Sequence, residues 1–285
     1  MSKAENFDDP PENVPFGSRE HLEWGQVALF EQTKLLEQVH NRIIDSSDSR
    51  SIALATTLSS MFETSRSILL LCRNNVRDSY ALSRILLDSA LNMAQYAIDE
   101  ELVDKAIRYS HQKSFRDLFR EIDLEDFQIK TNLNDVNEIP LPKNLMEAYE
   151  EFTSTKGHEL RHWSEESKMS AFKKIEIIST EIDEGIGQVL NLCLFSIYRH
   201  ASEIIHGTLF GTFYGMGLTL PGSEMVRSKE EYEDHVNNMN SYLMSILNLL
   251  LESTLRIVDS CYPIEDVLKE SRELNSHLSS MTSKK

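Results

Sequence analysis

Apolar residues recur three and four positions apart along most of the chain, the spacing that buries one face of a helix. In the first 120 residues the pattern is interrupted by the serine- and aspartate-rich run at 46–49 and by Asn74 and Asn75, where asparagine favours a turn. The stretches between these breaks predict helices over 18–44, 51–73, 76–99 and 101–120. No period-two alternation is strong enough to predict a sheet. The pattern is typical of an all-α protein.

The second half of the chain continues the helical spacing, with glycine and proline between the stretches. Ser228, followed three residues later by Glu231, matches a capping box and predicts the start of a long helix. The pattern predicts helices over 145–152, 165–184, 190–217 and 228–258, and a last helix after Pro263. Residues 121–142 are rich in Asp and Asn and predict a long surface loop. We therefore expect a multi-helix bundle.

The N-terminal 17 residues differ from the rest in composition. They are acidic and proline-rich with few hydrophobic residues, which predicts a disordered arm. Residues 18–285 are long enough to bury one large core, and we interpret them as a single helical domain that carries the loop at about 121–142.

Charge and cysteine content narrow the class of protein. The net charge of −17 would repel a polyanion over most of the surface, which argues against a general nucleic-acid coat or an anionic-membrane binder and leaves room only for a local basic pocket. The longest uncharged apolar segment, 204–222, is interrupted by glycines and Pro221, so no membrane span is predicted. The start of the sequence lacks the apolar run of a secretory signal. The cysteines are far apart in apolar helical patterns, and we expect reduced core thiols in a cytoplasmic protein: Cys72, Cys193 and Cys261.

The stretch 190–217 carries the best candidate chemistry, because polar residues gather there inside an apolar, glycine-rich pattern. Arg199, Glu203 and His206 are spaced i, i+4 and i+7, which places them on one helix face. Polar groups on an apolar helix cost free energy unless they find partners or do chemistry. The candidate residues of this stretch are Tyr198, Arg199, His200, Ser202, Glu203 and His206. Glycines at 207, 211 and 215 recur every four residues and favour close helix packing or a homodimer contact.

An arginine and two histidines within two helical turns suit phosphate chemistry. An imidazole transfers protons near neutral pH, and a guanidinium binds a phosphate through two hydrogen bonds. Together they are a minimal set for cleaving RNA through its own 2′-hydroxyl without a metal or cofactor. The competing interpretation is structural: Tyr198, Ser202 and His206 are satisfied core polar groups, and Arg199 pairs with Glu203.

A second polar group lies in the predicted helix 76–99. Arg84 and Asp88 are four residues apart, and Arg77 and Asn92 extend the same face. The simpler interpretation is an intrahelical ion pair worth a few tenths of a kcal/mol. If the face points into the bundle, the pair is instead a buried anchor or part of a site.

The string HELRH at 158–162 matches the zinc-protease pattern, in which two histidines one helical turn apart bind Zn²⁺ and the glutamate between them acts as general base. Its surroundings, with Gly157 before it and Trp163-Ser164 after it, are typical of a loop. We therefore keep a zinc metalloprotease through His158, Glu159 and His162 only as a remote alternative and predict no metal site.

Two resemblances follow from these motifs. Arg199-His200 through His206 resembles the R-polar-x(3 to 5)-H motif of the HEPN superfamily, all-helical ribonucleases and toxins that dimerise to bring two motifs together, although the spacing here is at the long end. The segments ALSRILLDSALNMAQY, HWSEESKMSAFKKI and YRHASEIIHGT are similar, in this order, to a bacterial helical family of unknown function with an L-x-R-x-L-x-E-like helix, a W-S element and a Y-x-x-x-S-x-x-[VI]-H-G-like helix. That likeness covers about Ile52 to Gly217.

The superfamily resemblance implies an HEPN-like helical core with flanking helices, in which Arg199 contacts the scissile phosphate, His206 acts as general base or acid, and His200 supports them. It implies an RNA substrate, a homodimer and a toxin or abortive-infection (phage defence) role, for which a partner protein encoded nearby is also expected. Arg84, Asp88, Tyr198, Ser202 and Glu203 would bind or support. The alternative is a non-catalytic helical interaction module, with Arg199 and His206 as buried structural groups.

Overall fold

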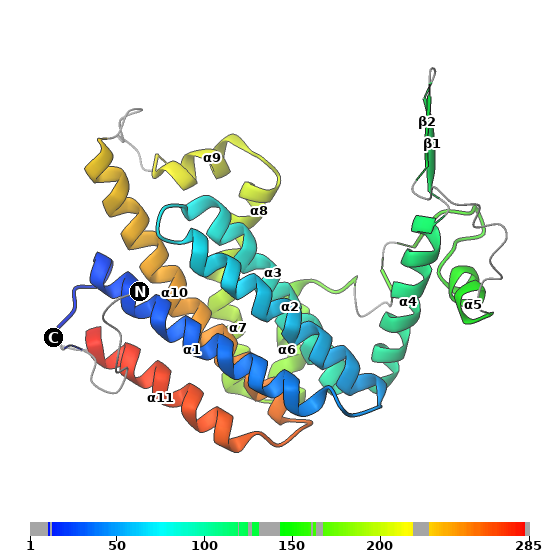
Figure 1. Cartoon of the computed structure of the whole chain (residues 1–285), viewed down its shortest axis with the longest axis horizontal. Coiled ribbons are helices and arrows are strands. Elements are labelled where there is room, and N and C mark those ends of the chain that lie inside the picture. Colours follow the sequence, from blue (N-terminus) through cyan, green and yellow to red (C-terminus); the bar gives the residue numbers. More distant parts are fainter. Residues whose placement is uncertain are drawn as a thin grey trace. The chain divides into compact units, whose positions relative to one another are not determined.

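The computed structural model describes residues 11, 13–118, 120–124, 127–130, 143–160, 162–163, 168–218 and 228–282. This part of the chain is mostly helical, which confirms the all-α prediction (Figure 1). Contacts divide the chain into two compact units, residues 1–98 with 171–285 and residues 99–170.

The first unit is built from helices that match the predicted ones closely up to residue 98. It contains α1 (Arg19–Ile43), α2 (Ser49–Leu71), α3 (Val76–Ile98), α6 (Ala171–Glu181), α7 (Glu184–Cys193), the π-helix η3 (Leu194–Tyr198), α8 (Arg199–Ile205), α9 (Leu209–Met216), α10 (Lys229–Asp259) and α11 (Glu265–Thr282). Helices α1, α2, α3 and α10 pack in a ring, since α2 and α10 each contact both α1 and α3 (Figure 1). Helices α7 and α8 pack on this bundle through α10 and α3 respectively.

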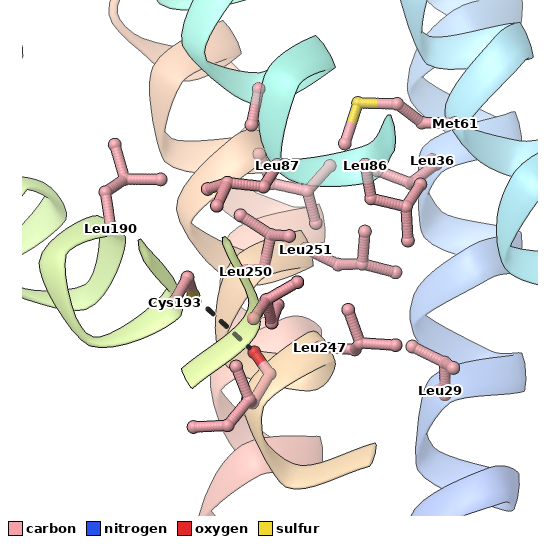
Figure 2. Close-up of a cluster of buried hydrophobic side chains, with 14 of the residues drawn as sticks. Leu29, Leu36, Met61, Leu86, Leu87, Leu190, Cys193, Leu247, Leu250 and Leu251 are labelled. Atoms are coloured by element: carbon pink, nitrogen blue, oxygen red, sulfur yellow. Dashed lines mark hydrogen bonds between the residues drawn. The ribbon is translucent and has the colours of Figure 1, made fainter. Parts of the chain in front are cut away.

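The core of the first unit lies where the apolar stripes of these helices meet. Figure 2 shows Leu29 of α1, Met61 of α2, Leu86 of α3, Cys193 of α7 and Leu250 of α10 converging there. Each of the five side chains is at most 1% exposed. The thiol of Cys193 lies 3.9 Å from the carbonyl oxygen of Ile246, and burial raises its pKa to about 12. Helix α7, which leads into the candidate site, is therefore fixed to the centre of the bundle.

Local capping explains where several helices begin. The Ser18 hydroxyl accepts the His21 N–H at the start of α1, and Asn75 accepts the Asp78 N–H at 2.9 Å at the start of α3. Ser228 and Glu231 form the reciprocal capping box at the start of α10. The capping box predicted at Ser228 and Glu231 is confirmed.

Helix α10 has the length and apolar composition to cross a membrane, but 72% of its most apolar window is buried inside the first unit. It is the central helix of the bundle, which explains that composition. Cys72 and Cys193 are buried, Cys261 is half-buried, and all three are free thiols.

The second unit contains α4 (Glu100–Leu118), β1 (Glu121–Leu124), β2 (Phe127–Lys130) and α5 (Lys143–Glu151). Helices α4 and α5 pack together, and Arg108 pairs with Glu151 through bonds of 2.7 and 3.0 Å. The expectation of a loop without strands is wrong for 121–124 and 127–130, which pair as antiparallel strands with Ile122 opposite Ile129. Residues 131–142 of the predicted loop lie outside the described part.

Candidate functional site

The candidate stretch is not one helix, as predicted, but four consecutive pieces: α7, η3, α8 and α9. Asp183 caps α7 by accepting the Ile186 N–H at 3.0 Å. Helix α8 ends at Ile205, and Gly207 adopts a positive φ of 65° before Thr208 caps α9. Glycine reaches that conformation without the steric cost that a Cβ imposes, so it ends α8 here.

The π-helix η3 directly precedes Arg199 and is tied to two distant helices. Ser196 is hydrogen-bonded to the Tyr242 hydroxyl of α10 at 2.7 Å. The guanidinium of Arg84 lies 4.4 Å from the ring centroid of Tyr198 and donates to its hydroxyl at 3.2 Å. These contacts hold η3 in place against α3 and α10. π-turns are rare and occur often at functional sites, which makes η3 part of the candidate site.

Arg84 joins this junction to a charged group on α3 and α6. Its Nε lies 3.5 Å from the Asp88 carboxylate, so the predicted intrahelical pair is present. The side chain of Arg84 is only 19% exposed. Desolvation raises the pKa of Asp88, against the opposing charges of Arg84 and Lys174. Lys174 in turn donates to Asn92 at 3.1 Å. Arg84 is thus an anchor between helices as well as half of an ion pair.

Arg199 and His206 are both exposed to solvent. Within the described residues, no hydrogen bond or ion pair engages either side chain. His206 is the last residue of the α8 turn, with its backbone N–H bonded to the Ser202 carbonyl at 3.0 Å. The structural interpretation requires Arg199 and His206 to be buried, and in the structure both are exposed.

Glu203 has a different partner from the one expected. Its carboxylate accepts the Thr208 hydroxyl at 2.7 Å, and the Thr208 hydroxyl also approaches the Glu203 carbonyl. The Arg199–Glu203 pair that the structural interpretation requires is absent within the described residues, and the turn into α9 supplies Thr208 as the donor instead. Ser202 is half-buried.

His200 points the opposite way, into an aromatic group formed by α3, α8 and α9. Its ring stacks on Tyr214 with centroids 4.2 Å apart and planes at 8°, and it meets the edge of Tyr80 at 6.4 Å. Desolvation, followed by the charge of Arg199, lowers the pKa of His200. Its buried Nδ1 has no hydrogen-bond partner among the described residues. A neutral imidazole packed in this way holds α8 against α3 and α9.

The glycines after His206 serve packing inside the chain. A Cβ on Gly211 would lie 2.6 Å from the backbone carbonyl of Glu203, and one on Gly215 would lie 2.9 Å from the Cβ of Arg77. Gly207 is open, with nothing within 4 Å. Because the chain turns at Gly207, the three glycines do not form one continuous stripe along a helix. The predicted close packing is confirmed for Gly211 and Gly215, which let α9 lie against α8 and α3.

The comparisons with known proteins give one match. A model for a family of unknown function, DUF5677, matches residues 51–217. The chain belongs to this family. No curated protein and no solved structure matches it.

The DUF5677 match covers both polar groups of the site and ends at Gly217, where α9 is capped. It agrees with the likeness expected from the sequence over about Ile52 to Gly217. Two central helices, α1 and α10, lie outside the match, and one of them supplies Tyr242 to η3. The DUF5677 segment is therefore completed by flanking helices of the same chain.

The HELRH string lies in the same matched region but lacks the geometry of a zinc site. Glu159 forms an isolated bridge with Thr153, and its carboxylate pairs with Lys113 of α4. His158 precedes it in an extended segment rather than on a helix. In the described part of the chain, no three His, Cys, Asp or Glu residues are grouped as metal ligands would be. The zinc-protease interpretation therefore lacks the helix on which it depends.

Two features of the site were missed in the sequence. The stretch 185–218 of this DUF5677 chain contains one acidic residue, Glu203, although the whole protein has 46. Phe195, one turn before Arg199, is 81% exposed, and Leu209 is 68% exposed. Acid depletion is visible in the sequence and could have been found there. The outward direction of Phe195 cannot be predicted from the sequence, because the same apolar pattern predicts a core position.

Proposed function

We propose that this DUF5677 protein is an HEPN-like endoribonuclease that cleaves RNA without a metal, through Arg199 and His206. The observation that carries the proposal is that both side chains are exposed on α8 and unpaired within the described residues. An unpaired guanidinium can bind a phosphate through two hydrogen bonds, and an exposed imidazole can exchange protons with a substrate hydroxyl.

The chemistry needs two proton transfers. A base removes the proton of the 2′-hydroxyl, whose oxygen attacks the adjacent phosphorus, and an acid protonates the departing 5′-oxygen. Arg199 stabilises the added negative charge on the phosphate oxygens as they approach the transition state. His206 supplies one proton-transfer group, and the His206 of a second copy supplies the other, so the active form is a homodimer. The products are a 2′,3′-cyclic phosphate and a free 5′-hydroxyl.

The class of biological role follows from this activity. An endoribonuclease that needs only its own side chains suits a cytoplasmic toxin or abortive-infection protein, restrained until needed by a partner encoded nearby. Local acid depletion around Arg199 supports access by a polyanion to this face despite the net charge of −17.

A second candidate function is a non-catalytic interaction module. The observation in its favour is that apolar side chains are exposed on the same segment, with Phe195 at 81% and Leu209 at 68%. Exposed apolar surface of this kind often marks contact with another protein.

The test is cleavage of a defined RNA by the purified protein in the presence of a chelator. His206→Ala should lower the rate about 100-fold or more, the usual contribution of a general acid or base. His158→Ala is the matched control, since His158 is also an exposed histidine and should leave the rate unchanged. If wild type and His206→Ala cleave equally, or neither cleaves, the nuclease proposal fails and the interaction module stands. Growth of bacteria after induction of the two proteins provides the parallel test in cells.

A further inference from the structure

Phe195 is the feature of this surface that the cleavage chemistry does not use. It is 81% exposed, more than Phe172 at 71% and far more than Phe210 at 39%. Its neighbours Leu194, Ser196 and Ile197 are all buried, so the π-helix turns this one ring outward. Ser196 is held from within by Tyr242, which fixes the direction of the turn.

The ring lies next to the proposed phosphate contact. Phe195 and Arg199 are four residues apart, about one helical turn. Arg199 and His206 are seven residues apart, about two turns, and all three side chains are exposed, so their spacing predicts one face along η3, α8 and its C-cap. An aromatic ring, a guanidinium and an imidazole are thus presented in sequence.

The scarcity of acidic residues along 185–218 favours a polyanion over a protein as the binding partner of this face. Glu203 is the one acid of 185–218, and its carboxylate is taken by the Thr208 hydroxyl. A protein partner that covered this face would have to desolvate Arg199, which has no counter-ion among the described residues. A phosphate group supplies that counter-ion directly.

We propose that Phe195 is a stacking platform for an unpaired base of the RNA substrate, adjacent to the phosphate bound by Arg199. The inference rests on the proposed function and sharpens it, because a base can lie on Phe195 only if it is not paired in a duplex. The substrate class is therefore single-stranded RNA, such as a loop or an unpaired end.

The experiment measures binding of a short fluorescent single-stranded RNA by full-length protein carrying His206→Ala, which keeps the strand intact. Adding Phe195→Ala should weaken binding about tenfold or more, the loss expected for one stacked base. Phe195→Trp should retain the affinity, because tryptophan offers a larger stacking face. Phe172→Ala is the matched control and should change nothing, since Phe172 is an exposed phenylalanine on α6. A duplex of the same sequence should bind more weakly than the single strand.

The outcomes separate this inference from the nuclease proposal. Equal affinity with and without Phe195, or equal binding of single strand and duplex, overturns the platform even if the protein cleaves RNA. Phe195-dependent binding by a wild-type protein that never cleaves supports the platform and overturns the nuclease. If Phe195→Ala instead changes the oligomeric state in sedimentation and leaves RNA affinity unchanged, or if no RNA binds at all, Phe195 is a protein contact and the platform is overturned.

Discussion

The segment from η3 to α9 has two faces, one exposed to solvent and one packed against the rest of the first unit. The outer face, defined by Phe195, Arg199 and His206, is exposed and makes no polar side-chain contact within the described residues. The inner face, defined by Ser196, Tyr198, His200, Gly211 and Tyr214, is packed on α3, α8 and α10 through hydrogen bonds, ring contacts and a close backbone approach. His200 and His206 have the same side chain, but only the first contributes to packing. Residue type and spacing therefore identify a candidate, and the face on which it lies decides its role.

Arg199→Ala, on the outer face, should have the largest effect and tests the contrast between the two faces most strongly. On the proposed mechanism, loss of the Arg199 guanidinium should lower RNA cleavage about 100-fold to 1000-fold. The melting temperature should stay within experimental error, because the side chain is exposed and makes no hydrogen bond or ion pair within the described residues. Arg199→Lys should recover part of the rate, since lysine keeps the charge but loses the bidentate contact. A large fall in melting temperature would show that Arg199 belongs to the inner face.

Gly211→Ala tests the inner face directly. Its Cβ would lie 2.6 Å from the Glu203 backbone, so α9 must move away from α8. We expect the free energy of unfolding to fall by up to about 3 kcal/mol in denaturant titrations. Gly207→Ala is the control, with a positive φ but open space around it, and should cost about 1 kcal/mol from backbone strain alone. Equal costs at both positions would mean that close approach is not what requires Gly211.

Arg84→Ala should loosen the π-helix from the inside. The partly buried cation–π contact with Tyr198 is worth about 1 kcal/mol, and its loss should lower the free energy of unfolding by that amount. Amide hydrogen exchange should accelerate at 194–198. The exposed pair of Arg66 with Phe62, at 5.4 Å, gives the control, and Arg66→Ala should have an effect near zero. Unchanged exchange in Arg84→Ala would show that the Tyr198 contact does not hold η3.

The smallest expected effect is a change in pH dependence at His200. Burial lowers the pKa of His200 in the folded protein below the unfolded value of 6.5, so the unfolded state binds the proton more readily. Stability should therefore be fully present above pH 6.5 and fall as pH decreases below it. His200→Phe, which keeps the ring stack, should reduce this fall between pH 7 and pH 5. Burial also lowers the pKa of His21, so His21 should still cause part of the loss of stability at low pH in this variant. An unaltered slope in denaturant titrations would contradict the assignment.

The sequence predicted well what is determined locally. The capping box predicted at Ser228 and the break predicted at Asn75 are both present, because a capping side chain bonds a backbone group two or three residues away. The apolar stripes of α1, α2, α3 and α10 predicted the main core, because residues three and four positions apart lie on one face of a helix. Glycine followed by Thr208 is an ordinary helix end and restart, so the break at Gly207 is also a local signal, although the four-residue glycine spacing favours one continuous helix.

What the sequence did not predict depends on residues far apart in the chain. The π-helix is bonded to Tyr242 of α10 and to Arg84 of α3, and no local pattern in 194–198 reveals either partner. The inward direction of His200 depends on Tyr80 and Tyr214 in the same way. The paired strands 121–124 and 127–130 carry only a short alternation of apolar residues, and the acidic composition around them favours a loop.

The π-helix also bears on how this family can vary in length. A π-turn holds one residue more than the α-turn it replaces, while the helices before and after it keep their directions. In this chain α7 stays fixed in the core by Cys193, and α8 stays fixed by His200. A relative that is shorter by one residue between Leu194 and Tyr198 should therefore have an uninterrupted α-helix there and still present its counterparts of Arg199 and His206 to solvent. An insertion or deletion at this point therefore changes the length of the chain and the direction of Phe195, which lies within η3, without moving Arg199 and His206.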